Sequence, residues 1–367
     1  MKPGLLILFL CLAVALAACG GGAGEATPPA SALTPSPATW GPRLVYLWPA
    51  DGAADLYALD PLSGGVQRLT EGAGVLEYSI SSDGTSIYFS ASPTKGSSHL
   101  YRLELAEGSD PAAPQLVLRC QDECRNPSLS PDGRWLAYER LNATPRAGVQ
   151  VWLLNPATAQ ARLAGDAGRR SQNPQWSSTG LLAFYDLDGK AFILYNPENL
   201  QSIRHANQTG EPGCWLADGS AYIAPEIYYV KLDESVQVGS SHLLSYPVQG
   251  GRATDLSQAD DLEDTDAACS PDGQWLAFTR KYLDPNRWSP GRQVWLMSSD
   301  GGEARMLTDE PTYNHYNLAW SPDGRWLAYL RFNQVTLNEP NELWMMNADG
   351  SVPLQLVIGG YAPQWLP

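Results

Sequence analysis

Short apolar runs separated by turn-forming residues fill most of this chain. The run Trp-Leu-Ala-Tyr at 135–138 returns as Trp-Leu-Ala-Phe at 275–278 and as Trp-Leu-Ala-Tyr at 326–329. Consecutive apolar positions indicate strands that are buried on both faces. Each run follows Ser-Pro-Asp-Gly, in which proline presets φ, aspartate bonds the following backbone and glycine tolerates a positive φ. The pattern predicts strands that leave tight turns and are sandwiched between neighbouring sheets.

Weaker copies of this turn at 82–84, 178–180 and 217–219 extend the pattern into a repeat. The turn glycines are Gly84, Gly133, Gly180, Gly219, Gly273 and Gly324, so their spacings are 49, 47, 39, 54 and 51 residues. A propeller blade has about 40–50 residues. Further apolar runs lie at 151–154, 294–297 and 343–346, each before another turn. Each unit therefore contains four predicted strands.

The two ends of the chain look like parts of one unit. Residues 361–365 match residues 173–176, which are expected to form the innermost strand of an internal unit. Residues 43–48 instead resemble a second strand that lacks a first. Pairing of these ends would leave no free sheet edge. We therefore expect an all-β fold, a seven-bladed β-propeller of four-stranded antiparallel blades over residues 40–367, with six blades as the alternative.

The first residues resemble a targeting signal. Lys2 precedes an apolar run at 5–16, which is shorter than the about 20 residues that span a bilayer. The run ends in Leu-Ala-Ala-Cys, which resembles the bacterial lipobox. We expect a lipoprotein signal peptide at 1–18 and acylation of Cys19; an ordinary secretory peptide with an incidental Cys19 is the alternative. Residues 19–39 offer almost nothing to bury and predict a flexible linker. The expected location is extracytoplasmic, with a lipid anchor in a bacterial membrane.

The charge of the chain narrows the range of partners. Lys and Arg number 24 and Asp and Glu number 39, which gives a formal charge of −15. An acidic body repels nucleic-acid phosphates and anionic lipid headgroups, so we expect no nucleic-acid partner. The expected partner is a protein or glycan of the cell envelope, and the chain is expected to be monomeric.

The Ser-Pro-Asp-Gly-x-Trp-Leu-Ala units resemble the propeller repeats of the TolB family over residues 40–367. Related units occur in tricorn-type and prolyl-oligopeptidase propellers and in oligogalacturonate lyases. This resemblance implies the fold. TolB proteins have an additional N-terminal α/β domain and six blades, so a role in the Tol–Pal system is not carried over.

The cysteines and histidines suggest little chemistry. Cys120 and Cys124 lie close enough for a local disulfide in an oxidising compartment. Cys214 and Cys269 are one repeat position apart on neighbouring innermost strands, which favours free buried thiols. The chain has no Gly-x-Ser-x-Gly elbow, and its four histidines are isolated from one another in sequence. Binding is therefore expected rather than catalysis.

Polar residues recur three positions before the end of each expected innermost strand. Side-chain oxygens occupy this position in five units, as Glu77, Asn126, Asn173, Asp266 and Asn317. If these side chains converge, they form a collar at one mouth of the channel that suits a hard cation such as Ca²⁺. Glu77, Asp264 and Asp266 are the possible ligands, although no cofactor is firmly expected. The alternative is that these residues cap strand starts and bind channel water.

Long loops on the last three blades carry residue types that anchor interfaces. The expected binding rim contains Tyr228, Tyr229, Tyr282, Arg287, Trp288, Tyr313, His315 and Tyr316. The alternative is that these aromatics cover their own blades. The favoured function is a membrane-tethered, non-catalytic binding or scaffold protein that engages its partner through this rim. The competing function is an extracytoplasmic polysaccharide lyase or glycosidase with a divalent ion at the channel mouth.

Overall fold

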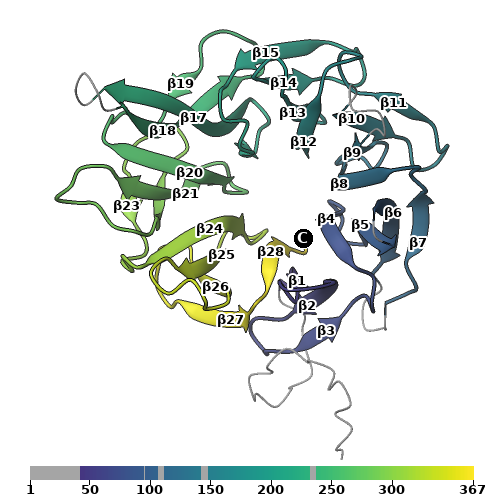
Figure 1. The fold of residues 1–367 in the computed structure, drawn as a ribbon, viewed down its shortest axis with the longest axis horizontal. Coiled ribbons are helices and arrows are strands. Elements are labelled where there is room, and N and C mark those ends of the chain that lie inside the picture. Colours follow the sequence, from purple (N-terminus) through teal and green to yellow (C-terminus); the bar gives the residue numbers. More distant parts are fainter. Residues whose placement is uncertain (1–41, 95, 106–110, 142–147, 232–236) are drawn as a thin grey trace, which may run out of the picture.

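The computed structural model describes residues 42–94, 96–105, 111–141, 148–231 and 237–367. Within these ranges the chain forms strands and turns but no helix, and hence no helix that could cross a membrane. The strands form seven four-stranded groups arranged as a ring around an open centre (Figure 1). The expected all-β propeller is confirmed. The signal peptide, Cys19 and the linker lie outside the described residues.

The first four blades follow the chain order of the repeats. Blade 1 contains β28 (Tyr361–Trp365), β1 (Leu44–Trp48), β2 (Asp55–Leu59) and β3 (Val66–Arg68). Blade 2 contains β4 (Val75–Ile80), β5 (Ser86–Thr94), β6 (Ser97–Glu104) and β7 (Gln115–Leu118). Blade 3 contains β8 (Glu123–Leu129), β9 (Leu136–Leu141), β10 (Val149–Leu154) and β11 (Ala161–Leu163). Blade 4 contains β12 (Ser171–Trp176), β13 (Leu182–Asp186), β14 (Ala191–Tyr195) and β15 (Ser202–Ala206).

The last three blades have the same strand order. Blade 5 contains β16 (Cys214–Trp215), β17 (Ala221–Lys231), β18 (Gln237–Pro247) and β19 (Thr254–Asp255). Blade 6 contains β20 (Leu262–Cys269), β21 (Trp275–Tyr282), β22 (Gln293–Ser298) and β23 (Arg305–Met306). Blade 7 contains β24 (Tyr313–Trp320), β25 (Trp326–Asn333), β26 (Glu342–Asn347) and β27 (Leu354–Ile358). Single parallel bridges join blade 2 to blade 3 and blade 5 to blade 6.

The ring closes by pairing of the two chain ends. β28 lies antiparallel to β1, with Leu44 opposite Trp365 and Val45 opposite Gln364. The backbone N–H of Leu366 also donates to the carbonyl of Arg43 at 2.8 Å. Blade 1 therefore combines an innermost C-terminal strand with three N-terminal strands. This is the closure that the sequence predicted.

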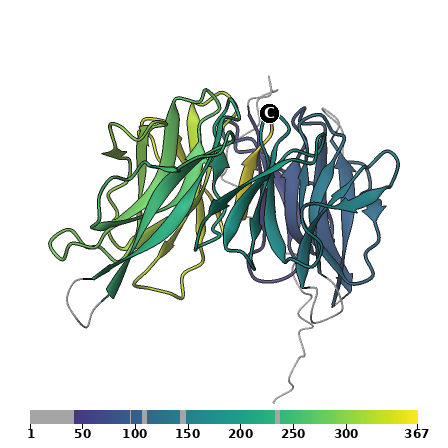
Figure 2. The same ribbon diagram turned by 90° about the horizontal axis from the view of Figure 1, so that it is seen from above.

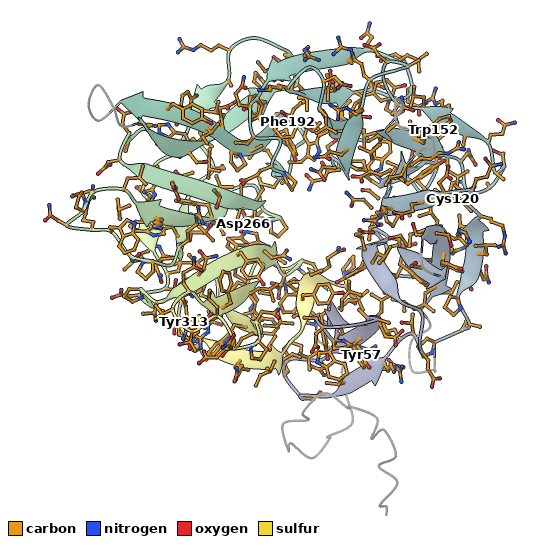
Figure 3. All side chains as sticks on the ribbon, in the orientation of Figure 1. Tyr57, Cys120, Trp152, Phe192, Asp266 and Tyr313 are labelled. Atoms are coloured by element: carbon orange, nitrogen blue, oxygen red, sulfur yellow. A yellow bond between two sulfur atoms is a disulfide. The ribbon has the colours of Figure 1, made fainter. Side chains whose placement is uncertain are left out.

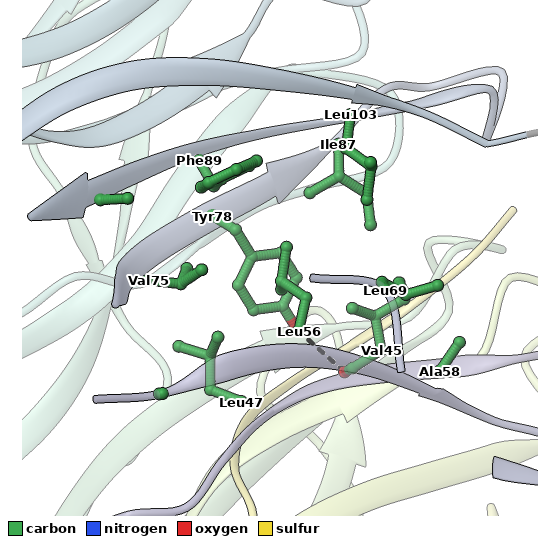
Figure 4. Packing of buried hydrophobic residues seen from close by; sticks show 12 residues of the cluster. Val45, Leu47, Leu56, Ala58, Leu69, Val75, Tyr78, Ile87, Phe89 and Leu103 are labelled. Atoms are coloured by element: carbon green, nitrogen blue, oxygen red, sulfur yellow. Dashed lines mark hydrogen bonds between the residues drawn. The ribbon is translucent and has the colours of Figure 1, made fainter. Parts of the chain in front are cut away.

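The core lies between blades, as the doubly apolar strands require. Val45 and Leu47 of blade 1 pack with Ile87 and Phe89 of blade 2, and all four side chains are buried (Figure 4). The hydroxyl of Tyr78 donates to the carbonyl of Val45 at 2.8 Å, so this boundary also contains a polar link. Burial of apolar surface on both faces of each sheet provides the main force that holds the blades together.

The Ser-Pro-Asp-Gly turns have a repeated hydrogen-bond pattern. In blade 3, Ser130 Oγ donates to Asp132 Oδ1 at 2.7 Å and accepts the N–H of Trp135 at 2.9 Å. Gly133 has a φ of 70°, which explains the glycine. We call the face that carries these turns the turn face. The opposite face carries the loops between second and third strands and is called the loop face (Figure 2).

Candidate functional site

The last residue of each innermost strand contacts the preceding blade. These residues are Trp365, Ile80, Leu129, Trp176, Trp215, Cys269 and Trp320 for blades 1 to 7. Four of them donate an indole N–H to a carbonyl of the preceding blade: Trp176 to Ser128 at 2.9 Å, Trp215 to Gln175 at 3.1 Å, Trp320 to Ala268 at 2.9 Å and Trp365 to Ala319 at 3.0 Å. The acceptor is each time the next-to-last residue of its strand. Neighbouring blades are therefore staggered by one position.

The stagger explains why the expectation for Cys214 and Cys269 is wrong. The two residues form a disulfide with a Cα–Cα distance of 5.7 Å. Cys269 is the last residue of β20 and Cys214 is the next-to-last residue of β16. Residues one position apart on neighbouring innermost strands therefore meet, so the offset that favoured free thiols instead brings the two sulfur atoms together. The disulfide joins blades 5 and 6 beside the channel.

The second disulfide joins Cys120 to Cys124, with a Cα–Cα distance of 6.0 Å. Cys120 lies in the connection from β7 to β8, and Cys124 is the second residue of β8. Both cysteines are buried and pack in the apolar cluster between blades 2 and 3 together with Tyr88, Leu100 and Tyr138. This disulfide therefore fixes an interblade connection against the core.

Four of the five expected collar residues occupy bulges of the innermost strands; Glu77 is instead paired with Ser90. Asn126, Asn173, Asp266 and Asn317 all have φ between 50° and 58°, and each lies within a register shift against the second strand. Asn and Asp enter this left-handed region more readily than most residues. The backbone conformation therefore explains why these residue types recur at this position. Figure 3 shows Asp266 on the inner side of the ring.

Three of these bulges bind a carboxylate of the preceding blade. The N–H of Asn126 donates to Glu77 at 3.4 Å, that of Asn173 to Glu139 at 2.7 Å, and that of Asn317 to Asp266 at 3.0 Å. Burial raises the pKa of Asp266 to about 6, and the charge of Glu211 adds to this effect. Burial likewise raises the pKa of Glu139. The collar atoms thus serve as links between blades.

The three possible ion ligands are not brought together. Glu77 belongs to blade 2 and Asp266 to blade 6. Asp264 is fully buried and accepts two bonds of 2.7 Å from Arg280, so its carboxylate is neutralised within blade 6. Among the residues that the structure describes, no group of three or more His, Cys, Asp or Glu is placed to hold a metal ion.

A ring of side chains, of which the sequence singled out only Cys214, lines the channel on the turn-face side. It consists of the next-to-last residues of the innermost strands: Gln364, Ser79, Ser128, Gln175, Cys214, Ala268 and Ala319. They border two adjoining cavities of about 650 and 380 Å³, which share the Cys214–Cys269 disulfide. The sequence could have indicated this ring, because none of the seven copies of this repeat position is a charged residue.

The expected rim divides into exposed and covered residues. Tyr228, Tyr229, Arg287 and Trp288 are exposed, and the side chains of Tyr229 and Trp288 retain 67% and 54% of their accessible surface. Tyr282, Tyr313 and Tyr316 are half-buried against their own blades. The rim gains two residues that the sequence did not single out, Val335 and Leu337 in the β25–β26 loop, which are 65% and 74% exposed.

His315 does not belong to the rim, which corrects its expected role. It is fully buried, with Nδ1 at 2.8 Å from the carbonyl of Arg292 and Nε2 at 3.2 Å from Glu310. The bonds with His315 and Arg331 lower the pKa of Glu310 to about 2. His315 is buried because it lies within β24, where its ring packs against Tyr329 and both ring nitrogens have polar neighbours.

Ser240, His242 and Asp255 form a chain in the order found in serine hydrolases. His242 Nδ1 lies 2.7 Å from Asp255, and Nε2 lies 3.0 Å from Ser240 Oγ. Ser240 is fully buried, however, and its hydroxyl donates to the carbonyl of Leu262 at 2.8 Å. Its proton is therefore directed away from the imidazole and its oxygen is closed to substrates. The chain links blades 5 and 6.

Parts of the chain are similar to known protein sequences. A family model described as the dipeptidyl peptidase IV N-terminal region matches residues 237–341. The uncharacterized peptidase YuxL of Bacillus subtilis is 47% identical over 60 residues, which are 16% of this chain and 8% of that protein. The uncharacterized protein YidR of Escherichia coli is 36% identical over 67 residues, which are 18% of this chain and 15% of that protein. The matched segments therefore span a small part of both relatives.

Solved structures resemble almost the whole described ring. TolB from Acinetobacter baumannii has a TM-score of 0.52 at 15% identity, with 90% of this chain and 68% of that chain covered. The β-propeller domain of the Trilobed protease from Pyrococcus furiosus has a TM-score of 0.56 at 12% identity, with 77% and 82% covered. A prolyl endopeptidase has a TM-score of 0.58 at 11% identity, with 86% and 50% covered. The TolB-like resemblance is confirmed at the level of the propeller fold.

Proposed function

We propose that this chain is a membrane-tethered, extracytoplasmic binding protein without catalytic activity, which engages a cell-envelope protein through the loop face of blades 5 to 7. The exposed apolar side chains at the loop-face end of β17 and on the β21–β22 and β25–β26 loops carry this proposal. They are Tyr228, Tyr229, Trp288, Val335 and Leu337. Aromatic residues in contiguous exposed groups are typical of protein-binding surfaces.

Basic side chains stiffen this surface. The Arg287 guanidinium lies 3.9 Å from the ring centre of Tyr282 and forms ion pairs with Asp261 and Asp284. The ammonium group of Lys281 lies 4.8 Å from the ring centre of Trp288. Aromatic residues that are already held in place lose less conformational entropy on binding, which favours hot-spot behaviour.

The edge of β17 favours a protein partner over a glycan. The carbonyl of Pro225 points away from β18, because it accepts bonds of 2.7 Å from Asn207 and Thr209. Strand alternation turns the backbone groups of Ile227 and Tyr229 to the same side. The N–H of Ile227 donates to Glu226, whereas no described residue pairs at Tyr229 with the edge of β17 that faces away from β18. An open edge can accept a further strand from an extended peptide.

The position of the chain ends agrees with a tether. Pro367 lies against Gly84 on the turn face, and β1 begins beside it. Figure 2 shows the β17–β18 hairpin extending to the opposite face, the loop face. A lipid anchor that precedes residue 42 would therefore connect to the turn face, and the loop face would be directed away from the membrane.

The test compares two triple variants. Tyr229→Ser/Trp288→Ser/Leu337→Ser should reduce capture of cross-linked partners from envelope extracts by more than ten-fold while leaving thermal unfolding unchanged. The control Leu62→Ser/Leu200→Ser/Val352→Ser removes side chains of 62%, 60% and 71% exposure from turn-face turns and should capture normally. Undiminished capture by the first variant rejects the proposed surface. Captured material that contains glycan and no protein rejects the protein partner.

The tether is tested separately. Cys19→Ala should abolish incorporation of a labelled fatty acid and release the protein from the membrane fraction, since the thiol proposed to carry the acyl chain is removed. Unchanged labelling of this variant would exclude acylation at Cys19.

A further inference from the structure

The channel ring on the turn-face side has one polar and one apolar arc. Blades 1 to 4 contribute Gln364, Ser79, Ser128 and Gln175, whereas blades 5 to 7 contribute the Cys214–Cys269 disulfide, Ala268 and Ala319. The smaller cavity extends the apolar arc with Ala267 and Leu318. A ligand that fills this space must therefore present hydrogen-bonding groups on one side and carbon on the other.

The two glutamines are oriented by the wall, and each leaves one polar atom free. The N–H of Gly213 donates to the hydroxyl of Tyr222 at 2.7 Å, so this hydroxyl donates in turn to Gln175 Oε1 at 2.7 Å. Gln175 Nε2 then remains as a donor. Gln364 Nε2 donates to the carbonyl of Tyr78 at 2.9 Å, which leaves Gln364 Oε1 as an acceptor.

A buried hydroxyl adds a third group to the polar arc. Ser79 Oγ is buried and has no hydrogen-bond partner among the described residues. A buried hydroxyl without a partner is unfavourable, so a ligand that bonds it recovers part of this penalty. The arc thus offers a fixed donor, a fixed acceptor and a hydroxyl that can do either.

The lining contains no charged side chain. Neither cavity is bordered by Asp, Glu, Lys, Arg or His, although the chain has 39 acidic and 24 basic residues. A charged ligand would lose hydration here without gaining a counter-ion. The free ends of a peptide and uronic acids are disfavoured for this reason.

We infer that this cavity binds a neutral saccharide, which inserts from the turn face. Sugar hydroxyls donate and accept at once, as the polar arc requires, and the C–H faces of the ring suit the apolar arc. The larger cavity, at about 650 Å³, lies within the range of about 300–1,000 Å³ that is usual for small-ligand sites. Trp176 and Trp215 also border it. The site is separate from the loop face and does not depend on the function proposed for that face.

The test titrates the full-length protein with cellobiose, maltose and chitobiose, and with digalacturonate as the charged counterpart. Calorimetry and tryptophan fluorescence should show saturable binding of a neutral disaccharide, at least ten-fold tighter than digalacturonate. Ser79→Ala should weaken this binding at least three-fold without lowering the melting temperature, because no residue in the described part of the chain bonds to this hydroxyl. Gln364→Met should weaken it at least ten-fold, and Gln160→Met on an exposed turn should have no effect.

Absence of binding by all three neutral disaccharides at 20 mM would overturn the inference. Equal binding of digalacturonate, or unchanged binding by both Ser79→Ala and Gln364→Met, would do the same. The loop-face triple variant should bind the saccharide normally, so failure here is distinguishable from failure of the proposed loop-face function.

Discussion

The disulfide between Cys214 and Cys269 occupies the place of an interblade hydrogen bond. Cys269 stands at the strand position of Trp320, and Cys214 stands at the position of Ala268, whose carbonyl accepts the Trp320 indole. The same pair of strand positions therefore forms a hydrogen bond at one blade boundary and a disulfide at another. At four boundaries an indole reaches back to the preceding blade, and at the boundary of blades 5 and 6 a covalent bond does so.

Removing this disulfide should destabilise the ring strongly. Cys214→Ser/Cys269→Ser opens a loop with a sequence separation of 55, for which chain entropy predicts a loss of about 4 kcal/mol. Cys120→Ser/Cys124→Ser opens a separation of 4, with a predicted loss of about 2 kcal/mol. Urea unfolding of both variants measures the difference. A larger loss for the second pair would contradict the entropic argument.

The indole at this position can be restored. Cys214→Ala/Cys269→Trp should be more stable than Cys214→Ala/Cys269→Ala, since the new indole can donate to the carbonyl of residue 214. The expected gain includes about 0.5–1.5 kcal/mol for the hydrogen bond. Trp320→Phe should lose a similar amount, whereas Trp288→Phe on the loop face should change unfolding by less than about 0.5 kcal/mol. Equal effects at Trp320 and Trp288 would reject the role of the bond.

The Asp264–Arg280 pair should be costly to break from one side. Arg280→Met leaves the fully buried Asp264 without its partner and should cost about 3–5 kcal/mol. Arg280→Met/Asp264→Leu should recover most of this loss, because no buried charge remains. The exposed Arg134 serves as the control, and Arg134→Met should leave the denaturant midpoint almost unchanged, because its ion pairs are exposed to solvent. Denaturant midpoints at pH 7 compare the three variants.

The raised pKa of Asp266 predicts a pH dependence with a definite sign. Its pKa is about 6 in the folded chain and 3.8 without the fold, so the folded state holds the proton more tightly between these values. The contribution of Asp266 to stability is therefore favourable in acid and decreases as pH rises from about 4 to about 6. Asp266→Asn should raise the melting temperature relative to the parent more at pH 7.5 than at pH 4.5.

The fold was predictable because the repeat specifies it at several levels. The turn at 130–133 fixes a hairpin, the doubly apolar run at 135–138 requires neighbours on both faces, and the copy at 361–365 predicts the closing strand. These three inferences depend on local chemistry and on the repeat length. None of them requires knowledge of how neighbouring blades are offset.

The channel was less predictable because it depends on that offset and on bulges. Asn126 and Asn317 suggested a collar, but a positive φ and a bulge explain them. Gln175 and Gln364 could not be recognised as channel residues, because the same repeat position holds Ser, Cys or Ala in the other blades. His315 looked like a loop residue, although β24 begins two residues earlier at Tyr313 and points His315 into the blade.

Because β28 pairs with β1, the position of the chain ends is not essential to the ring, and the chain could begin and end at another blade. Leu366 and Arg43 are hydrogen-bonded at the point where the other blades have a covalent turn. A short linker from Pro367 to Arg43, with a new opening at the turn of Gly133 or Gly324, would keep every strand beside its present neighbours. Such permuted chains would move an attachment point around the circumference while preserving the binding surface.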